Sequence, residues 1–410
     1  MSIKEKTVER FLRYVQIPTA SDENSDMTPS TPCQFDLARV LVEDMLAMGI
    51  EDAHVDEKCY VYGSIPAAPG LEKCPAIGFI AHVDTVADFT AHKVNPIVHE
   101  NYDGKDLSLG DSGRILKNSD FDHLPSLTGR TLITSDGTTL LGADDKAGVV
   151  EILTMADEIL SGDLPHGRIC ISFTPDEEIG AGAKDLDLKK FGADFAYTID
   201  GGKEGLVEYE NFNAASARFD IAGVGVHPGD AKDIMVNAAL LIMEINGMLP
   251  EKETPARTEG YEGFYHLTSV EGGVEKAQAS YIVRDHDRGC YLKRLDTLRA
   301  IEEAMNQKYG EGTVQLTVKE QYRNMKEKIE PHFHLIENAK TAIKKTGILP
   351  EIIPIRGGTD GSQLSFRGLP CPNLGTGGYA FHGPYEHITA EGMEAVVNIL
   401  LGIVEEYASF

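Results

Sequence analysis

The spacing of apolar residues changes along the chain and predicts a layered α/β architecture. Apolar side chains recur at intervals of three and four over residues 4–17 and 35–50, which predicts two early helices. Three short apolar runs then end in polar residues, as the buried strands of a parallel sheet do. These runs cover residues 74–84, 168–178 and 195–202. Because a helical pattern over 144–162 separates the first two runs, we expect a layered, mostly parallel sheet with its functional site at the carboxyl ends of the strands.

The pattern changes near residue 213 and returns near residue 323. Between these points the expected order is β-α-β-β-α-β, with one of the two helices over 234–249, which predicts a ferredoxin-like inserted domain. We therefore expect a catalytic domain in two parts with an inserted α+β lid and dimerisation domain between them. The three segments are 1–212, 213–322 and 323–410.

Charge and composition exclude several classes of partner. The chain has 38 Lys and Arg against 65 Asp and Glu, a formal net charge of −27, which repels nucleic acids and anionic membranes. No apolar stretch approaches the ~20 residues of a membrane span. The start of the chain lacks a signal-peptide pattern, and the six cysteines form no CxxC pair. These features predict a cytoplasmic protein.

Histidine and aspartate residues lie at the end of one predicted strand and at the start of the predicted helix over 144–162. His82 and Asp84 lie two residues apart and share one face of a strand, so Asp84 can approach an imidazole nitrogen and fix the tautomer of a metal-bound histidine. A solvated loop is the alternative. Asp144 and Asp145 lie at the start of the next helix, where helix capping is the alternative to metal binding.

Two adjacent glutamates, Glu177 and Glu178, follow the second predicted strand. Neighbouring residues on a strand point to opposite faces, so both side chains can serve one centre only where the strand has ended. One carboxylate would then bind a divalent cation while the other takes a proton from a bound water molecule. A solvated acidic turn is the alternative.

Two further candidate ligands come from glycine-rich segments. Asp200 precedes two glycines at a strand end, and His382 lies in GGYAFHGPYEH, four residues before Glu386. An ordinary turn is the alternative for each. Two imidazoles and three carboxylates can together hold two zinc ions with one bridging carboxylate. This candidate set is His82, Asp144, Glu178, Asp200 and His382.

The order of these motifs resembles that of the dinuclear zinc exopeptidases related to glutamate carboxypeptidase and aminoacylase. The motifs in chain order are HVD, GADDKAG, PDEE, DGG, HPG, RGGTDG and HGxxE. The segments NFNAAS, TEGYEGFYHL and PIRGGTDGSQLSF extend the resemblance over nearly the whole chain, and they are similar to the tripeptide aminopeptidases of that family.

The resemblance implies a role for each candidate ligand. His82 and Asp200 would hold one zinc ion, Glu178 and His382 the other, and Asp144 would bridge both, with cobalt or manganese as substitutes. The peptide bond between Asp144 and Asp145 would be cis.

The same resemblance implies two catalytic roles and four contacts with the peptide. Asp84 would orient His82, and Glu177 would act as the general base that takes a proton from a zinc-bridging water and delivers it to the leaving amine. His227 would reach into the active site of the partner subunit and stabilise the oxyanion, and Arg284 would bind the terminal carboxylate of the peptide. The glycine-rich loop would place Arg356 and Asp360 near the substrate.

Simpler interpretations of these four residues stay open. His227 precedes a proline turn, and Arg284 lies beside a run that favours an ion pair among its members. The run contains Asp285, Asp287 and Arg288. A glycine turn without a ligand is the alternative for the loop of Arg356 and Asp360.

We therefore predict a cytoplasmic homodimer that releases the N-terminal residue of short peptides, tripeptides foremost, by attack of a zinc-bridging hydroxide. A carboxypeptidase or an acyl-amino-acid hydrolase on the same scaffold is the alternative. A metal-binding protein without catalytic activity is a second alternative, against which the retention of Glu177 argues.

Overall fold

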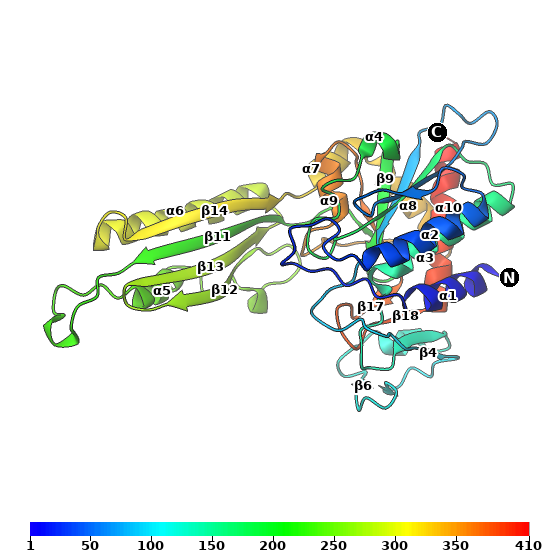
Figure 1. The fold of residues 1–410 in the computed structure, drawn as a ribbon. Coiled ribbons are helices and arrows are strands. Elements are labelled where there is room, and N and C mark those ends of the chain that lie inside the picture. Colours follow the sequence, from blue (N-terminus) through cyan, green and yellow to red (C-terminus); the bar gives the residue numbers. More distant parts are fainter. Residues whose placement is uncertain (410) are drawn as a thin grey trace. The chain divides into compact units, whose positions relative to one another are not determined.

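Two groups of secondary structure form separate units in the computed structural model, which describes residues 1–409 (Figure 1). The first unit contains Met1–Tyr209, Glu327–Ile353 and the chain from Thr359 onward, and the second contains Glu210–Lys326 and Pro354–Gly358. The short segment joins the second unit because Ile355 N donates to Glu210 O at 2.8 Å. The boundaries of independently folding domains at 212/213 and 322/323 stay a prediction.

The first unit is built on an eight-stranded mixed sheet. Its order is β1 (His54–Val55), β2 (Val61–Ile65), β8 (Ile169–Thr174), β3 (Ile77–His82), β9 (Phe195–Gly201), β16 (Asn373–Gly375), β10 (Leu206–Glu208) and β15 (Glu351–Ile352). The four central strands β8, β3, β9 and β16 run parallel, which confirms the predicted fold class. Strands β3 and β8 are buried along their whole length, as inner strands between two helical layers are.

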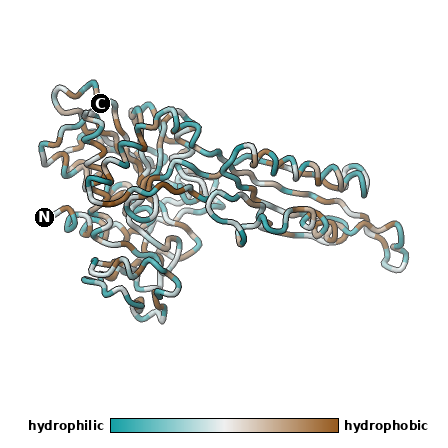
Figure 2. The backbone as a smooth tube through the Cα atoms, turned by 180° about the vertical axis from the view of Figure 1, so that it is seen from behind, coloured by the Kyte–Doolittle hydropathy of each residue, from teal (hydrophilic) through white to brown (hydrophobic). Residues whose placement is uncertain are grey.

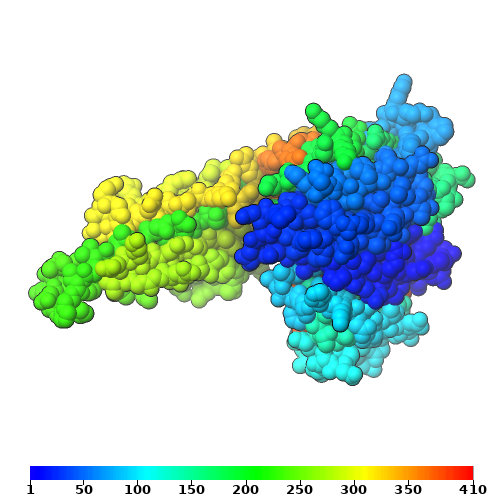
Figure 3. Space-filling model, viewed as in Figure 1, coloured from blue at the N-terminus to red at the C-terminus, as the bar shows by residue number. Residues whose placement is uncertain are grey.

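Helices pack against both faces of this sheet. One layer consists of α1 (Ile3–Tyr14), α2 (Gln34–Met48), α3 (Ala143–Ser161), α8 (His334–Lys345) and α10 (Ala390–Ala408). The other face packs against α4 (Leu188–Phe191) and α9 (Asp360–Phe366), whose apolar side chains meet Ile80 and Ala196. Apolar stretches gather inside this unit in Figure 2, and Figure 3 shows the N-terminal segment with α1 and α2 on one of its faces.

A small antiparallel sheet, which the sequence pattern did not predict, lies at the edge of the first unit. It consists of β17 (Gly378–Tyr379), β18 (His387–Thr389), β7 (Leu132–Ser135) and β4 (Pro96–His99). A two-stranded ribbon, β5 (Leu107–Ser108) and β6 (Ile115–Leu116), follows β4 in the chain. Short helical turns complete the unit: η1 (Leu124–Leu127), η4 (Glu330–His332) and α7 (Lys326–Ile329), which begins at the unit boundary.

The second unit has the predicted β-α-β-β-α-β order. Its antiparallel sheet is ordered β12 (Phe264–Gly272), β13 (Lys276–Asp285), β11 (Asn213–Ala222) and β14 (Val314–Tyr322), and its helices are α5 (Ala238–Gly247) and α6 (Arg288–Tyr309). Two short turns, η2 (Pro228–Asp230) and η3 (Pro255–Arg257), lie in its loops. Alternate residues of β13 are buried beneath the helices, which gives this unit a core of its own.

Helix α5 begins later than the apolar pattern over 234–249 predicts. The side chain of Asn237 accepts hydrogen bonds from the amides of Ala239 and Leu240, at 3.1 and 3.4 Å. This N-cap fixes the start of the helix at Ala238. No helix within residues 1–409 combines the length and the apolar character that crossing a membrane requires.

Candidate metal centre

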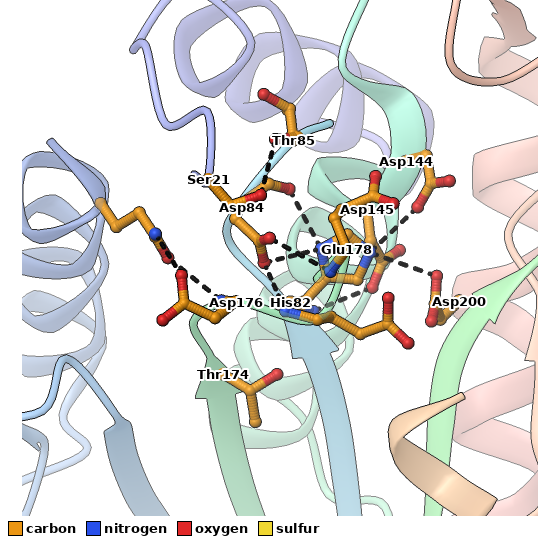
Figure 4. A network of polar contacts seen from close by, with 12 residues as sticks. Ser21, His82, Asp84, Thr85, Asp144, Asp145, Thr174, Asp176, Glu178 and Asp200 are labelled. Atoms are coloured by element: carbon orange, nitrogen blue, oxygen red, sulfur yellow. Dashed lines mark hydrogen bonds and ion pairs between the residues drawn. The ribbon is translucent and has the colours of Figure 1, made fainter. Parts of the chain in front are cut away.

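His82, the last residue of β3, lies at the centre of a cluster of carboxylates (Figure 4). Its Nε2 is 3.0 Å from Asp144 Oδ1 and 3.4 Å from Asp200 Oδ1. Its Nδ1 faces Asp84 and lies 3.0 Å from the main-chain oxygen of Asp84 and 3.3 Å from Asp84 Oδ1. The ring is buried, so Asp84 fixes its orientation and leaves Nε2 directed at the cluster.

Asp144 lies between the two candidate histidine ligands. Its Oδ2 is 3.0 Å from Nε2 of His382, while Oδ1 faces His82. His382 is also 3.2 Å from Glu178 Oε2. His82, Asp144, Glu178 and His382 therefore bring four separate segments of the chain together, and the peptide bond that follows Asp144 is cis, as the resemblance predicts.

The donor set fits divalent cations. Ligand atoms of His82, Glu177 and Asp200 all lie within 4.8 Å of one another, as do those of His82, Asp144 and Glu178. Within residues 1–409, Oε1 of Glu178 is buried without a hydrogen-bond partner. Imidazole nitrogens and carboxylate oxygens at this spacing are the ligands that zinc takes in proteins, and the orphaned oxygen is available for such a bond.

The turn that carries Glu177 and Glu178 is held by Asp84. The amide of Glu177 donates to Asp84 Oδ1 at 2.9 Å, and the amide of Glu178 donates to Oδ2 at 3.2 Å. Asp84 therefore positions both glutamates in addition to His82. The sequence predicted only its contact with the histidine, because the amides of a distant turn leave no signal in the sequence around Asp84.

Three more carboxylates support the cluster in ways that the sequence did not predict. Asp145 accepts from the amides of His82 and Gly148, at 3.1 and 3.2 Å. Asp176 has a left-handed φ of 59° and accepts hydrogen bonds from Ser30 and Gln34. Glu386 accepts from three main-chain amides, those of Leu141, Gly142 and Asp144.

Burial and close packing of like charges shift the ionisation of this cluster. Burial raises the pKa of Asp200 to about 7, and it also raises the pKa of Glu177 and that of Glu178. Hydrogen bonds to Asp144 and Glu178 raise the pKa of His382 to about 11. Burial works against ionisation of Asp144, yet the hydrogen bonds from His382 and His82 lower its pKa overall.

These shifts predict how stabilisation by zinc depends on pH. A carboxyl group such as Asp200 keeps its proton in the metal-free folded protein up to about pH 7, whereas the unfolded chain loses it near pH 4, so stability falls as pH rises between these values. The contribution of His382 is full below about pH 6.5 and is lost as pH rises through about 11. Both effects lower the stability of the metal-free protein between pH 6 and pH 8.

At the higher pH, fewer protons also compete with zinc for the ligand atoms. We therefore expect zinc to raise the melting temperature more at pH 8 than at pH 6, as measured by calorimetry of chelator-treated protein with and without added zinc. An equal or smaller gain at pH 8 would contradict these pKa directions.

The structure places the remaining predicted site residue of the first unit, Asp360, in the interior. Asp360 is the first residue of α9, and its Oδ2 accepts from Thr174 Oγ1 at 2.9 Å. Its Oδ1 is buried and has no hydrogen-bond partner in the described part of the chain. Its charge contributes to the raised pKa of Glu177, so Asp360 influences the cluster electrostatically.

The other three predicted contacts with the peptide lie in the second unit. His227 is exposed and accepts from the amide of Gly229 at 3.1 Å. Arg284 donates to the main-chain oxygens of Ala215 and Val283, and its guanidinium lies over the ring of Tyr322. Their roles toward a substrate stay predictions.

The alternative ion pair among the residues that follow Arg284 is not formed in the structure. Asp285 instead pairs with Arg294 at 2.8 Å, and Arg288 pairs with Glu320 at 2.8 Å.

Arg356 has a structural role that its loop sequence did not reveal. Its guanidinium donates to the main-chain oxygens of Thr258, Gly260 and Glu262, at 3.3, 2.7 and 3.0 Å, and to the hydroxyl of Thr258 at 3.0 Å. It also lies over the rings of Phe212 and Phe264. Arg356 thus fastens the segment 354–358 to the second unit, and a contact with substrate stays a prediction.

Comparison with known proteins shows the family of this chain. The model of the peptidase family M20/M25/M40 matches residues 117–406. Peptidase T of Alkaliphilus oremlandii is 50% identical over 404 residues, which cover 98% of this chain and 99% of that protein. Peptidase T of Clostridium novyi is 49% identical over 406 residues, which cover 98% of this chain and 100% of that protein.

Solved structures share the fold. Aminopeptidase PepT from Bacillus cereus superposes with a TM-score of 0.79 at 23% identity, over 99% of both chains. The YXEP protein of Bacillus subtilis, described as a dinuclear metal-binding peptidase of family M20, superposes with a TM-score of 0.65 at 14% identity, over 99% of this chain and 98% of that one. The matches confirm the resemblance that the motifs predicted. This chain belongs to the peptidase family M20/M25/M40, and it is similar over nearly its whole length to members named peptidase T.

Proposed function

We propose that the protein is an aminopeptidase that releases the N-terminal residue of short peptides, tripeptides foremost, at a centre of two zinc ions. The observation that carries the proposal is the position of Asp144, whose two carboxylate oxygens face His82 and His382 at 3.0 Å each. His82 and Asp200 are proposed to hold one ion, and Glu178 and His382 the other. The relatives named peptidase T support the choice of substrate.

Two zinc ions bound at this centre would polarise the scissile carbonyl and lower the pKa of a water molecule, with cobalt or manganese as substitutes. The chain's own residues then control the proton. A carboxylate oxygen of Glu177 takes the proton of the attacking water and delivers it to the nitrogen of the leaving amine. Asp84 keeps Glu177 in place through the amide hydrogen bond of 2.9 Å, and its contacts with Nδ1 of His82 leave Nε2 directed at the cluster.

Contacts with the ends of the peptide would set the length of the substrate. Arg284 presents a planar fork that suits the terminal carboxylate, and His227 offers a ring nitrogen to the oxyanion in the site of the partner subunit. If the metal centre fixes the scissile bond and Arg284 fixes the terminus, only peptides of one length satisfy both. The main chain of the loop that carries Arg356 and Asp360 is proposed to contact the peptide, since hydrogen bonds or burial occupy both side chains.

The proposal includes a cytoplasmic homodimer without nucleic-acid or membrane partners. The net charge of −27 supports the absence of nucleic-acid and membrane partners, because it repels phosphate groups. The predicted position of His227 in the partner's site requires the dimer. Sedimentation analysis measures the assembly directly, and a monomer with full activity would remove His227 from the proposed mechanism.

A comparison of one tripeptide with its N-acetylated form tests the substrate class. We expect the free tripeptide to yield its N-terminal residue and the intact dipeptide, and the acetylated form to react with a kcat/KM lower by about 10²-fold, because a site that binds a charged amine rejects the blocked one. Mass spectrometry of the products measures both reactions.

The other outcomes identify the alternatives. Release of the C-terminal residue would indicate a carboxypeptidase, and equal reaction of the acetylated form would indicate an acyl-amino-acid hydrolase. Two bound zinc ions without hydrolysis of any short peptide would indicate a metal-binding protein without catalytic activity.

A further inference from the structure

Glu386 is a buried carboxylate that joins the segment of His382 to the segment of Asp144. Its Oε2 accepts from the amides of Leu141 and Gly142, at 2.8 Å each. Its Oε1 accepts from the amide of Asp144 at 2.9 Å. Both oxygens of the Glu386 side chain therefore accept hydrogen bonds from a single stretch of main chain at the start of α3.

This stretch lacks support from its own side chains. Gly142, the N-cap residue of α3, has a left-handed φ of 82° and contributes no side-chain cap. The first amides of a helix have no acceptor within the helix. Glu386 supplies acceptors to this turn from a segment 242 to 245 residues away in the chain.

The other end of the connection is also fixed. The amide of Glu386 donates to the carbonyl of Gly383 at 3.2 Å, which closes the turn that follows His382. His387 comes next and is buried in β18, where it pairs with Thr134. Its Nε2 lies 2.8 Å from Nε2 of His123. A shift of Glu386 would therefore require β18 to move as well.

Glu386 contacts Asp144, the residue whose carboxylate faces both His82 and His382. One of the three amides that donate to Glu386 belongs to Asp144, whose carboxylate is 3.0 Å from His382 Nε2. His382 itself has a left-handed φ of 66° and a half-exposed side chain, so little packing holds its ring. The separation between these two side chains thus depends on the connection through Glu386.

We propose that Glu386 is a positioning residue that sets the distance between Asp144 and His382 and thereby the affinity for the cation that these residues share with Glu178. The inference rests on the proposed metal centre. Because both of its oxygens accept from main-chain amides, we assign Glu386 no role as a metal ligand or as a contact of the substrate. It acts through the two segments that it connects.

Zinc affinity of the Glu386→Gln variant tests the inference. Glutamine has nearly the same size, but its NH₂ group cannot accept from an amide, so at least one of the three hydrogen bonds is lost. We expect zinc to bind the site of Asp144, Glu178 and His382 about 10–100-fold less tightly, as the loss of outer supports of metal ligands usually causes. Competition with a chromogenic chelator measures this affinity without reference to activity.

The matched control is Glu151→Gln. Glu151 is equally buried, lies on α3, and has no hydrogen-bond partner for either oxygen among residues 1–409. We expect this variant to bind zinc as the wild type does. The visible spectrum of the cobalt-loaded proteins gives a second readout, because it reports the geometry around the ion, and only the Glu386 variant should change it.

The outcomes distinguish a failure of the proposed function from a failure of this inference. A wild-type protein that binds no zinc would overturn the proposed function. Wild-type zinc affinity and an unchanged cobalt spectrum in Glu386→Gln, even with a lowered melting temperature, would overturn this inference alone and make Glu386 merely structural.

If Glu386→Gln does not fold, Glu386→Asp takes its place. Aspartate keeps the charge but is shorter by one methylene group, so it cannot reach all three amides. We expect zinc affinity to fall by about 10-fold. Unchanged affinity in that variant would overturn the inference equally.

Discussion

Replacement of Glu177 by glutamine is expected to lower kcat by about 10²–10⁴-fold while both cations stay bound, which is the usual effect of losing a general acid–base group. The amide matches the carboxylate in size but cannot take a proton at neutral pH. The geometry of the turn should persist, because the main-chain amide of Glu177, and not its side chain, holds the turn to Asp84.

Steady-state kinetics on a tripeptide and the zinc content of the purified variant together test this expectation. The control is Glu208→Gln, which also neutralises a buried carboxylate. Glu208 accepts from Asn373 at 2.7 Å and lies outside the cluster, so we expect near-normal kcat in that variant.

Two results would contradict the proposed role of Glu177. Near-normal kcat in Glu177→Gln would remove this residue from the mechanism. Loss of a zinc ion would make Glu177 a ligand, an alternative with a structural basis because its carboxylate lies within ligand distance of His82 and Asp200.

The parts of the fold that could be predicted from the sequence are those with long, regular patterns. The runs over 74–84, 168–178 and 195–202 contain β3, β8 and β9, because strands buried on both faces need continuous apolar residues. The sheet of β4, β7, β17 and β18 could not be predicted. Its strands have two to four residues, too few for a period to appear, and they come from distant parts of the chain.

The cluster could be predicted from the positions of its residues at strand ends as much as from their residue types. His82 ends β3, Asp200 lies near the end of β9 and Glu178 lies in the turn after β8, and the carboxyl ends of these neighbouring strands meet at one edge of the sheet. The supporting residues Asp176 and Glu386 carried no comparable signal. Their partners are an N-terminal loop and main-chain amides, and main-chain partners cannot be identified from sequence without the fold.

Asp144→Asn is expected to have the most severe effect of any single substitution at the centre. A bridging carboxylate binds one cation with each oxygen, and asparagine offers one oxygen and an NH₂ group that cannot bind a cation. The loss of both cations would remove several kcal/mol of transition-state stabilisation, which corresponds to a fall in kcat of roughly 10³–10⁴-fold.

Asp200→Asn provides the comparison that separates bridging from ordinary coordination. Asp200 lies 3.4 Å from His82 and is proposed to hold only the cation on that side, so its variant should keep the other cation. Zinc analysis after dialysis should therefore find almost no zinc in Asp144→Asn and about half of the wild-type content in Asp200→Asn. Equal zinc content in the two variants would contradict the bridging role. Asp144 would then hold only one cation, although each of its oxygens faces a different histidine.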